Sequence, residues 1–437
     1  GGVSRGGRLS TEPQVGRNST EHSPPTVSSG RSLSHKTSRK STVMMTNSQV
    51  MALRVKELTD IIPTSEDTSE INPGEDVYAS AWSIASDRFL QMSFRLAGIL
   101  SWEGSGRWAL LGQWLYKGSL MLLLTGAAAL VAMAVTRAHL GDEHAWAAPW
   151  LRALDRPGGF QLTTQVLLAA AAPMLLVALG LMRSTNRPDD VVSMLQSYAS
   201  QNGLFEMWQK LALVDTGFIS MIFVLSVTLH MLDSSSEGMP IAERIALATV
   251  TGLIYGMLAA GLTFVMYVLR ILSVMVDVFC YQSVQNPNIS EATESWNMLQ
   301  AILRKASNFL EHALLVLLAV AMLTVPLLVL DVGHLGWQSA AFRMQVPYAL
   351  VMCGVLRVFA VAAAVTDKCM RVPALINSLS FGLGTERERQ HLVEYITQSA
   401  AGFYIGETRL CMPMVAKFVY VWFVILFSFV GQELSQA

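Results

Sequence analysis

Ionisable side chains inside apolar segments are the residues of this sequence that could do chemistry. Asp215, His230, Arg357 and Lys417 each fall in, or at the edge of, an apolar run of about 20 residues. A charge in hydrocarbon is costly, so each is expected to pair, to face a water-filled cavity, or to bind a ligand or ion. Arg357 stands near the middle of its run, whereas Asp215 is near the end of its own, where a solvated or capping role is simpler. Further members of this set are Glu243, Asp277, Glu311 and His312.

Motifs for catalysis or metal binding are absent from the sequence. There is no P-loop, Rossmann glycine pattern, HExxH, CxxC or GxSxG, and the 8 histidines are scattered. The cysteines lie in apolar runs or on the predicted cytoplasmic side, where we expect them to stay reduced. They are Cys280, Cys353, Cys369 and Cys411. We therefore expect a protein that is not an enzyme, with no cofactor, no metal and no nucleic-acid partner.

The composition indicates an integral membrane protein. Of the 437 residues, 52% are hydrophobic and 14% charged, against roughly 25% charged in an ordinary soluble protein. Seven apolar runs are long enough to cross about 30 Å of hydrocarbon as helix. They are Gly118–Val135, Leu162–Met182, Leu211–Leu232, Ile245–Leu269, Ala313–Leu330, Val346–Val365 and Cys411–Val430. The helical pattern of the fourth run continues past Arg270, which predicts a projection into the cytoplasm.

The distribution of Lys and Arg predicts the orientation. Basic residues are several times more frequent beside the predicted inner ends of the spans than beside the outer ends, as with Arg183, Arg304 and Lys368. The inner loops are also the longer ones, and helices continuing from spans four to six could pack there as an anchor. We predict an all-α membrane protein with seven transmembrane helices, a cytoplasmic N-terminus, an extracellular C-terminus and a cytoplasmic anchor, most simply in the plasma membrane.

The chain divides at about residue 78. Residues 1–43 are rich in Ser, Thr and basic residues and poor in large apolar ones, so we expect disorder. The same composition fits a transit peptide, and Met44 or Met45 is a candidate start. The acidic segment Ile61–Tyr78 reads as a linker, so residues 1–78 form a disordered and linker region and residues 79–437 the membrane domain. An amphipathic helix over Ala79–Trp102 is expected at the inner interface, with Trp82, Phe89, Met92, Leu96 and Leu100 on its apolar face.

Spans three and four could form an apolar pocket with a few polar anchors. Aromatic and methionine side chains at helical spacing are more often core or lipid-facing residues than a site. Small organic ligands nevertheless bind pockets of this composition. The candidate pocket residues are Thr216, Ser220, His230, Tyr255, Met257 and Arg357.

The stretch "GFYIGETRLCMPMVAKFVYVWFVILFSFV", Gly402 to Val430, resembles the C-terminal signature of the insect odorant and gustatory receptor superfamily, which includes gustatory-receptor-like proteins outside insects. Gly402 and Phe403 stand in that family's glycine and phenylalanine lead-in, and Val421 to Phe429 aligns with its last helix without gaps. Val421 and Trp422 replace the family's threonine and tyrosine, Ser428 replaces a glutamine, and Phe429 keeps the terminal aromatic.

The resemblance implies a ligand-gated cation channel, a homo- or heterotetramer, whose last helices line one pore and whose subunits each bind a small organic ligand among helices two to six. Its partners would be that ligand, cations and the lipid bilayer. Positions carried over to the narrow pore are Val424, Phe427, Ser428 and Val430. Lys417 departs from this pattern, because a fourfold lysine ring repels cations unless it snorkels to a wide vestibule or pairs with Glu407.

Two other classes stay open. A secondary transporter could use Arg357 and Asp215 as a substrate or proton pair, although no internal repeat is evident. A non-conducting membrane scaffold could bind partners through its cytoplasmic helices. A retinal protein using Lys417, or a G-protein-coupled receptor, would need the opposite orientation.

Overall fold

The computed structural model describes residues 73–100, 115–126, 159–181, 188–234, 241–335, 339–379, 386–399 and 401–436. The predicted disordered segment and the predicted linker up to residue 72 lie outside these residues. The first predicted span is described only to residue 126, where residues 115–126 are helical.

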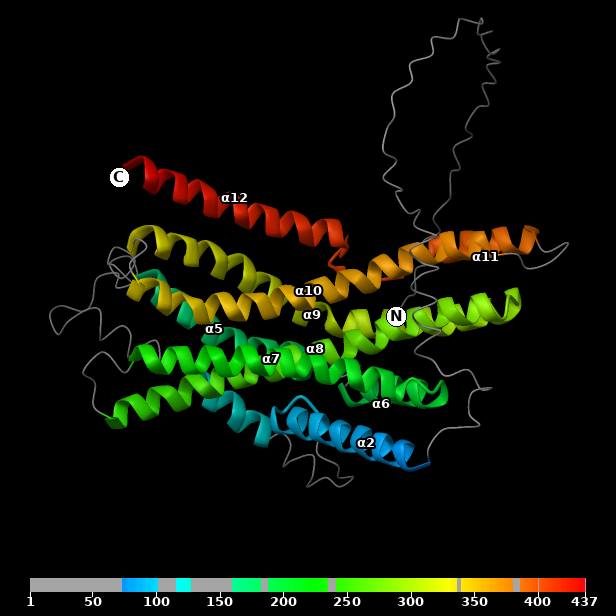
Figure 1. The fold of residues 1–437 in the computed structure, drawn as a ribbon, viewed down its shortest axis with the longest axis horizontal. Coiled ribbons are helices and arrows are strands. Elements are labelled where there is room, and N and C mark those ends of the chain that lie inside the picture. The colour runs from blue at the N-terminus through cyan, green and yellow to red at the C-terminus, as the bar shows by residue number, and fades with distance from the viewer. Residues whose placement is uncertain are drawn as a thin grey trace, which may run out of the picture. The chain divides into compact units, whose positions relative to one another are not determined.

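Helices make up almost all of the described chain (Figure 1). In order they are α2 (Pro73–Leu96), α5 (Gly159–Leu176) with a π-helical turn η2 (Val177–Leu181), α6 (Pro188–Gln201), α7 (Phe205–Ser234), α8 (Ile241–Gln285), α9 (Ile289–Leu335), α10 (Ser339–Ser378), α11 (Glu386–Gln398) and α12 (Met412–Gln436). A two-residue hairpin, β1 (Tyr404–Ile405) and β2 (Thr408–Arg409), precedes α12.

Six of the predicted spans coincide with apolar helices. Within the described residues, four helices have the length and composition to cross a membrane: Phe205–His230, Ala248–Gln285, Ile289–Leu330 and Gln345–Ser378. Two shorter apolar segments are Val166–Leu179 and Met412–Ile425. The number of spans and their orientation stay predictions.

Helices α8, α9 and α10 are longer than a bilayer needs. With 45, 47 and 40 residues and a rise of about 1.5 Å per residue, each exceeds the roughly 30 Å of a hydrocarbon core. The extensions are packed: the indole of Trp296 is buried against Phe279, with ring centroids 5.2 Å apart, and donates to Ser399 Oγ at 3.3 Å. The predicted continuation past Arg270 is confirmed, and helical extensions of α9 and α10 accompany it.

Helix α8 is the centre of the described helices. It contacts α5, α7, α9 and α10. In its most apolar stretch 89% of the residues are buried inside the protein, against 28% in that of α7. Figure 1 shows α7 and α10 running beside α8. Most side chains of α8 are therefore surrounded by other helices of the protein, although that of Arg270 keeps an exposed fraction of 23%.

Helix α2 begins earlier than predicted and has a second apolar face that packs on protein. It begins at Pro73, not Ala79, because proline is well tolerated in a first helical turn, so residues 73–78 are helical. Leu90 and Phe94, each 1% exposed, face the protein. The predicted apolar residues Phe89, Met92 and Leu96 lie on the exposed side, which agrees with an interfacial helix that contacts α7 and α8 on its other face.

Candidate functional site

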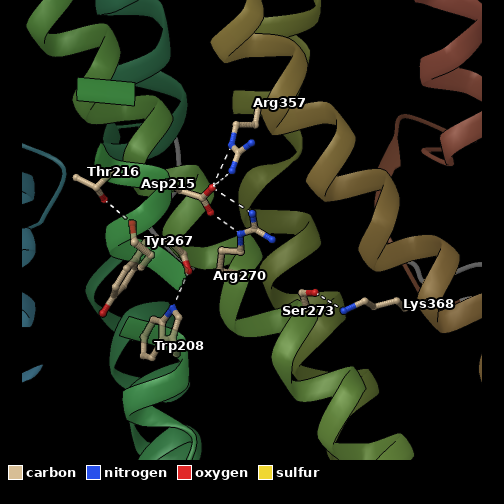
Figure 2. Close-up of polar contacts among 9 residues, drawn as sticks. Trp208, Asp215, Thr216, Tyr267, Arg270, Ser273, Arg357 and Lys368 are labelled. Carbon is tan, nitrogen blue, oxygen red and sulfur yellow. Dashed lines mark hydrogen bonds and ion pairs between the residues drawn. The ribbon is translucent and has the colours of Figure 1, made fainter. Parts of the chain in front are cut away.

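Two arginines, from α8 and α10, meet at Asp215 on α7. The carboxylate of Asp215 on α7 is 1% exposed. Arg357 on α10 donates to its Oδ1 from Nε at 3.0 Å and from Nη2 at 2.5 Å. Arg270 on α8 donates from Nε to Oδ2, and from Nη2 to Oδ1 at 3.1 Å. Figure 2 shows both guanidinium groups converging on this one carboxylate. We call Asp215, Arg270 and Arg357 the charged triad.

The triad brings Arg357 to the level of Asp215 and Arg270. Both arginines donate to Asp215, so Arg357 at mid-span and Asp215 at the end of its span cannot both be right. The apolar residues that follow Arg357 on α10 include Val358, Ala362 and Val365, all fully buried. Because these residues are buried against protein, their apolar character does not by itself show that they lie in lipid.

A second ion pair lies farther along α8 and α10. Lys368 on α10 donates to Ser273 Oγ at 2.7 Å and forms an ion pair with Asp277. Figure 2 shows Lys368 reaching toward Ser273 on the neighbouring helix. This pair is electrically balanced, whereas the triad holds two positive charges and one negative.

Helix α2 is joined to the core by a series of hydrogen bonds that the sequence did not reveal. Tyr267 Oη donates to Asp87 Oδ1 at 3.0 Å, and Trp208 Nε1 donates to the Tyr267 carbonyl at 2.9 Å. Gln91 donates to the other oxygen of Asp87 at 2.6 Å. Burial raises the pKa of the Asp87 carboxyl, although the bonds from Tyr267, Gln209 and Gln91 oppose the shift. The only signal in the sequence was an aspartate within an amphipathic helix.

The predicted pocket residues do not share one environment. Thr216 donates its hydroxyl to the carbonyl of Ala212 at 2.7 Å, and Ser220 is exposed. Tyr255 is 6% exposed and lies near Tyr348. His230 and Met257 are half-buried, and Arg357 is engaged with Asp215. Their assignment to a ligand pocket stays a prediction.

The structure explains the glycine and phenylalanine of the lead-in. Gly402 has φ +144, and a Cβ at this position would lie 2.8 Å from Thr366 Cγ2 on α10. Phe403 is fully buried, and its backbone N–H donates to Thr366 Oγ1 at 2.9 Å. The chain then turns through β1 and β2, with Gly406 at φ +60 in the two-residue loop. The motif therefore fixes the start of α12 to α10.

Helix α12 packs on one side only. It contacts α9 and α10, with Val415 at 7% exposure and Trp422 half-buried on that side. On the other side Val421, Val424 and Phe427 are 47%, 44% and 68% exposed, and Lys417 and Ser428 are exposed too. The described residues hold no ion pair between Lys417 and Glu407. The side chains of Phe429 and Val430 lie outside the described residues.

Similarity to known proteins lies in the fold and not in the sequence. No protein-family model and no curated protein matches the chain. The structure of the insect olfactory receptor OR5 from Machilis hrabei in complex with eugenol aligns with a TM-score of 0.55 at 9% identity, covering 80% of this chain and 99% of that one. A second structure of the same receptor gives 0.56 at 8% identity, covering 80% and 98%. The resemblance seen in the last helix is thus confirmed at the level of the fold: this all-helical membrane protein has the fold of an insect olfactory receptor.

Proposed function

We propose that this chain is a subunit of a ligand-gated cation channel of the insect odorant and gustatory receptor superfamily, and not an enzyme. The pore of the tetramer is lined by α12. The observation that carries the proposal is the one-sided packing of α12, a 25-residue apolar helix of an olfactory-receptor fold whose other face is exposed. Other copies of the chain, arranged around a central axis, would cover the flanks of that face.

The exposed residues of α12 follow a regular spacing. Lys417, Val424 and Gly431 repeat every seventh residue, and Val421 and Ser428 fall on the same side between them. A heptad spacing keeps one stripe of a helix facing a partner or an axis. In the tetramer Val424 and Phe427 form apolar rings that close by dewetting, and Ser428 supplies a polar contact. Val430 is included from the sequence alignment alone.

The membrane arrangement of the proposal is the one expected from the sequence. Seven helices cross the plasma membrane, the N-terminus is cytoplasmic and the C-terminus extracellular. The extensions of α8, α9 and α10, with α11, form the cytoplasmic anchor, and the membrane domain occupies residues 79–437 with α2 continuing it back to Pro73. Support comes from the length of these helices and from the packing of Trp296 and Ser399 between them.

The ligand of the proposed channel is a small organic molecule bound among the outer parts of α5 to α10, near Tyr255, Met257 and His230. The eugenol complex of the Machilis hrabei receptor supports this class of ligand. For the ligand to open the pore, it must bind the open state more tightly than the closed one. Helix α10 links the two regions, since it carries both Arg357 and the Thr366 contact to the lead-in.

Recording from the purified protein in planar bilayers tests the channel. We expect cation currents that a panel of small odorant-like molecules increases. Val424→Cys should then be blocked by a water-soluble thiol reagent, whereas Val415→Cys, on the packed side, should not. Absence of conductance across a broad chemical panel would refute the proposal, and equal block of both variants would remove α12 from the pore.

A transporter is the second candidate, because its proposed pair, Arg357 and Asp215, is indeed in contact. The same carboxylate also accepts two bonds from Arg270, which leaves it poorly suited to release and take up protons or substrate. Uptake of solutes into vesicles driven by a pH gradient, lost in Asp215→Asn, would favour this candidate over the channel.

A further inference from the structure

Among the described residues, the charged triad holds two positive charges and one negative charge. Arg270 and Arg357 share one carboxylate, that of Asp215. Lys368, by contrast, has an ion pair of its own with Asp277. An uncompensated charge at the edge of an apolar region is costly. A further anion beside the two arginines would balance it.

Both guanidinium groups also have unused donors. Each bonds to Asp215 through Nε and Nη2, while Nη1 has no hydrogen-bond partner among the described residues. Neither Nη1 is among the buried atoms that lack a partner, so both reach accessible surface. The side chains are 23% and 33% exposed, against 1% for Asp215. The carboxylate is thus enclosed, and the arginines present their free edges outward.

The surroundings suit the polar end of an amphiphile. The guanidinium of Arg357 lies 4.6 Å from the ring centroid of Phe218, which holds it in place from the apolar side. The triad stands where the apolar runs of α7 and α8 end, so the apolar chain of a bound molecule could lie along exposed apolar residues such as Val214, which is 66% exposed. The planar guanidinium group suits oxyanions, because its parallel N–H groups match the oxygens of a phosphate or carboxylate.

We propose that Arg270 and Arg357 form a binding site for the oxyanion of an amphiphile, either the phosphate of an anionic lipid or the carboxylate of an apolar acid. Asp215 is the fixed counter-ion that orients the two guanidinium groups toward it. The site lies at the level of the triad and uses Arg357, which is also a candidate residue for the small organic ligand, but not Tyr255, Met257 or His230. Its existence does not depend on whether the protein conducts ions.

Thermal unfolding of the purified full chain in a neutral detergent tests the site. Phosphatidylglycerol should raise the unfolding temperature in a saturable way, whereas phosphatidylcholine should not. Arg357→Gln should weaken the apparent affinity by about tenfold or more, since a charge-assisted contact is lost. Lys210→Gln, which removes an exposed cation of α7, is the matched control and should leave the affinity unchanged.

Asp215→Asn separates binding from a merely structural role of the triad. It leaves both arginines without their counter-ion, so the variant should be less stable in neutral detergent but should bind phosphatidylglycerol more tightly than the unchanged protein. A loss of stability with no gain in affinity would overturn the proposal. So would an Arg357→Gln variant that binds as well as Lys210→Gln. If Arg357→Gln does not fold, the direction in which Asp215→Asn changes the affinity for phosphatidylglycerol decides the question.

Inorganic phosphate and octanoate identify the source of the oxyanion. If octanoate reproduces the effect and competes with phosphatidylglycerol, the site accepts free apolar acids. If neither small anion acts, the ligand is a membrane lipid. Either result supports the site, whereas equal stabilisation of all variants by inorganic phosphate would show a general salt effect and overturn it.

Discussion

Replacing Gly402 by alanine should destabilise the protein more than its size suggests. At φ +144 a residue with a Cβ is strained by about 1–3 kcal/mol. The new methyl would also lie 2.8 Å from Thr366 Cγ2 and 3.1 Å from Thr366 Oγ1, and overpacking of this kind costs about 1–3 kcal/mol. Because Phe403 donates to that same hydroxyl, the backbone cannot move away without losing a buried bond. We expect a total of roughly 2–6 kcal/mol.

Denaturant titration of the purified protein in detergent measures this cost, with two matched variants. Gly217→Ala, in α7, has no atom within 4 Å of the new Cβ and no positive φ, so it should be neutral or stabilising by up to about 1 kcal/mol. Thr366→Ser removes Cγ2 but keeps the hydroxyl, so in combination with Gly402→Ala it should recover part of the loss. If Gly402→Ala behaves like Gly217→Ala, or if the double variant is simply additive, the clash is not the reason for the glycine.

Three further changes test other parts of the structure. Trp208→Phe removes the bond to the Tyr267 carbonyl from a fully buried position, and should lower the free energy of unfolding by about 1–3 kcal/mol in the same titration. Asp87→Asn should flatten the pH dependence of stability. Burial raises the pKa of Asp87 above its usual 3.8, so the stabilisation that the protonated carboxyl gives the folded protein is complete below pH 3.8 and is lost as the pH rises through the raised pKa. A variant with the unchanged pH profile would refute this assignment. Lys417→Gln, if α12 lines the pore, should shift the reversal potential toward greater cation selectivity, because the exposed ammonium faces the same side as Val424; an unchanged reversal potential would place Lys417 away from the ions.

The sequence predicted the helices well, because each is a long apolar run with few helix-breaking residues inside it. Spans three to six appear as α7 to α10, and the long continuation of α8 follows from an apolar pattern that does not stop at Arg270. The predicted depths of Asp215 and Arg357 disagree for a physical reason, since the structure holds both at one level. A window of apolar residues does not distinguish lipid from a protein neighbour, and α10 is apolar along a stretch where it packs on α8.

The partners of the charged residues were harder to predict than their presence. Asp215 and Arg357 were recognised as costly in hydrocarbon and named as a pair in the transporter hypothesis, but Arg270 was taken only as the end of a span. The second apolar face of α2 was missed for a similar reason, because Leu90 and Phe94, which pack on protein, are as apolar as Phe89 and Met92. Which apolar face meets protein and which meets the membrane depends on the neighbours, and one helix sequence does not contain that information.

Helix α10 is the element on which the separate parts of the structure meet. Arg357 joins it to Asp215, Lys368 joins it to α8, and Thr366 holds Phe403 of the lead-in. The next residue, Asp367, accepts a bond from the first backbone N–H of α12, that of Met412, at 3.4 Å. The contact at Phe403, 2.9 Å and fully buried, is the tighter of these two. A displacement of α10 would therefore be transmitted to α12 first through the lead-in. This explains why the contacts of Gly402 and Phe403 require particular residues, whereas α12 itself requires mainly apolar ones.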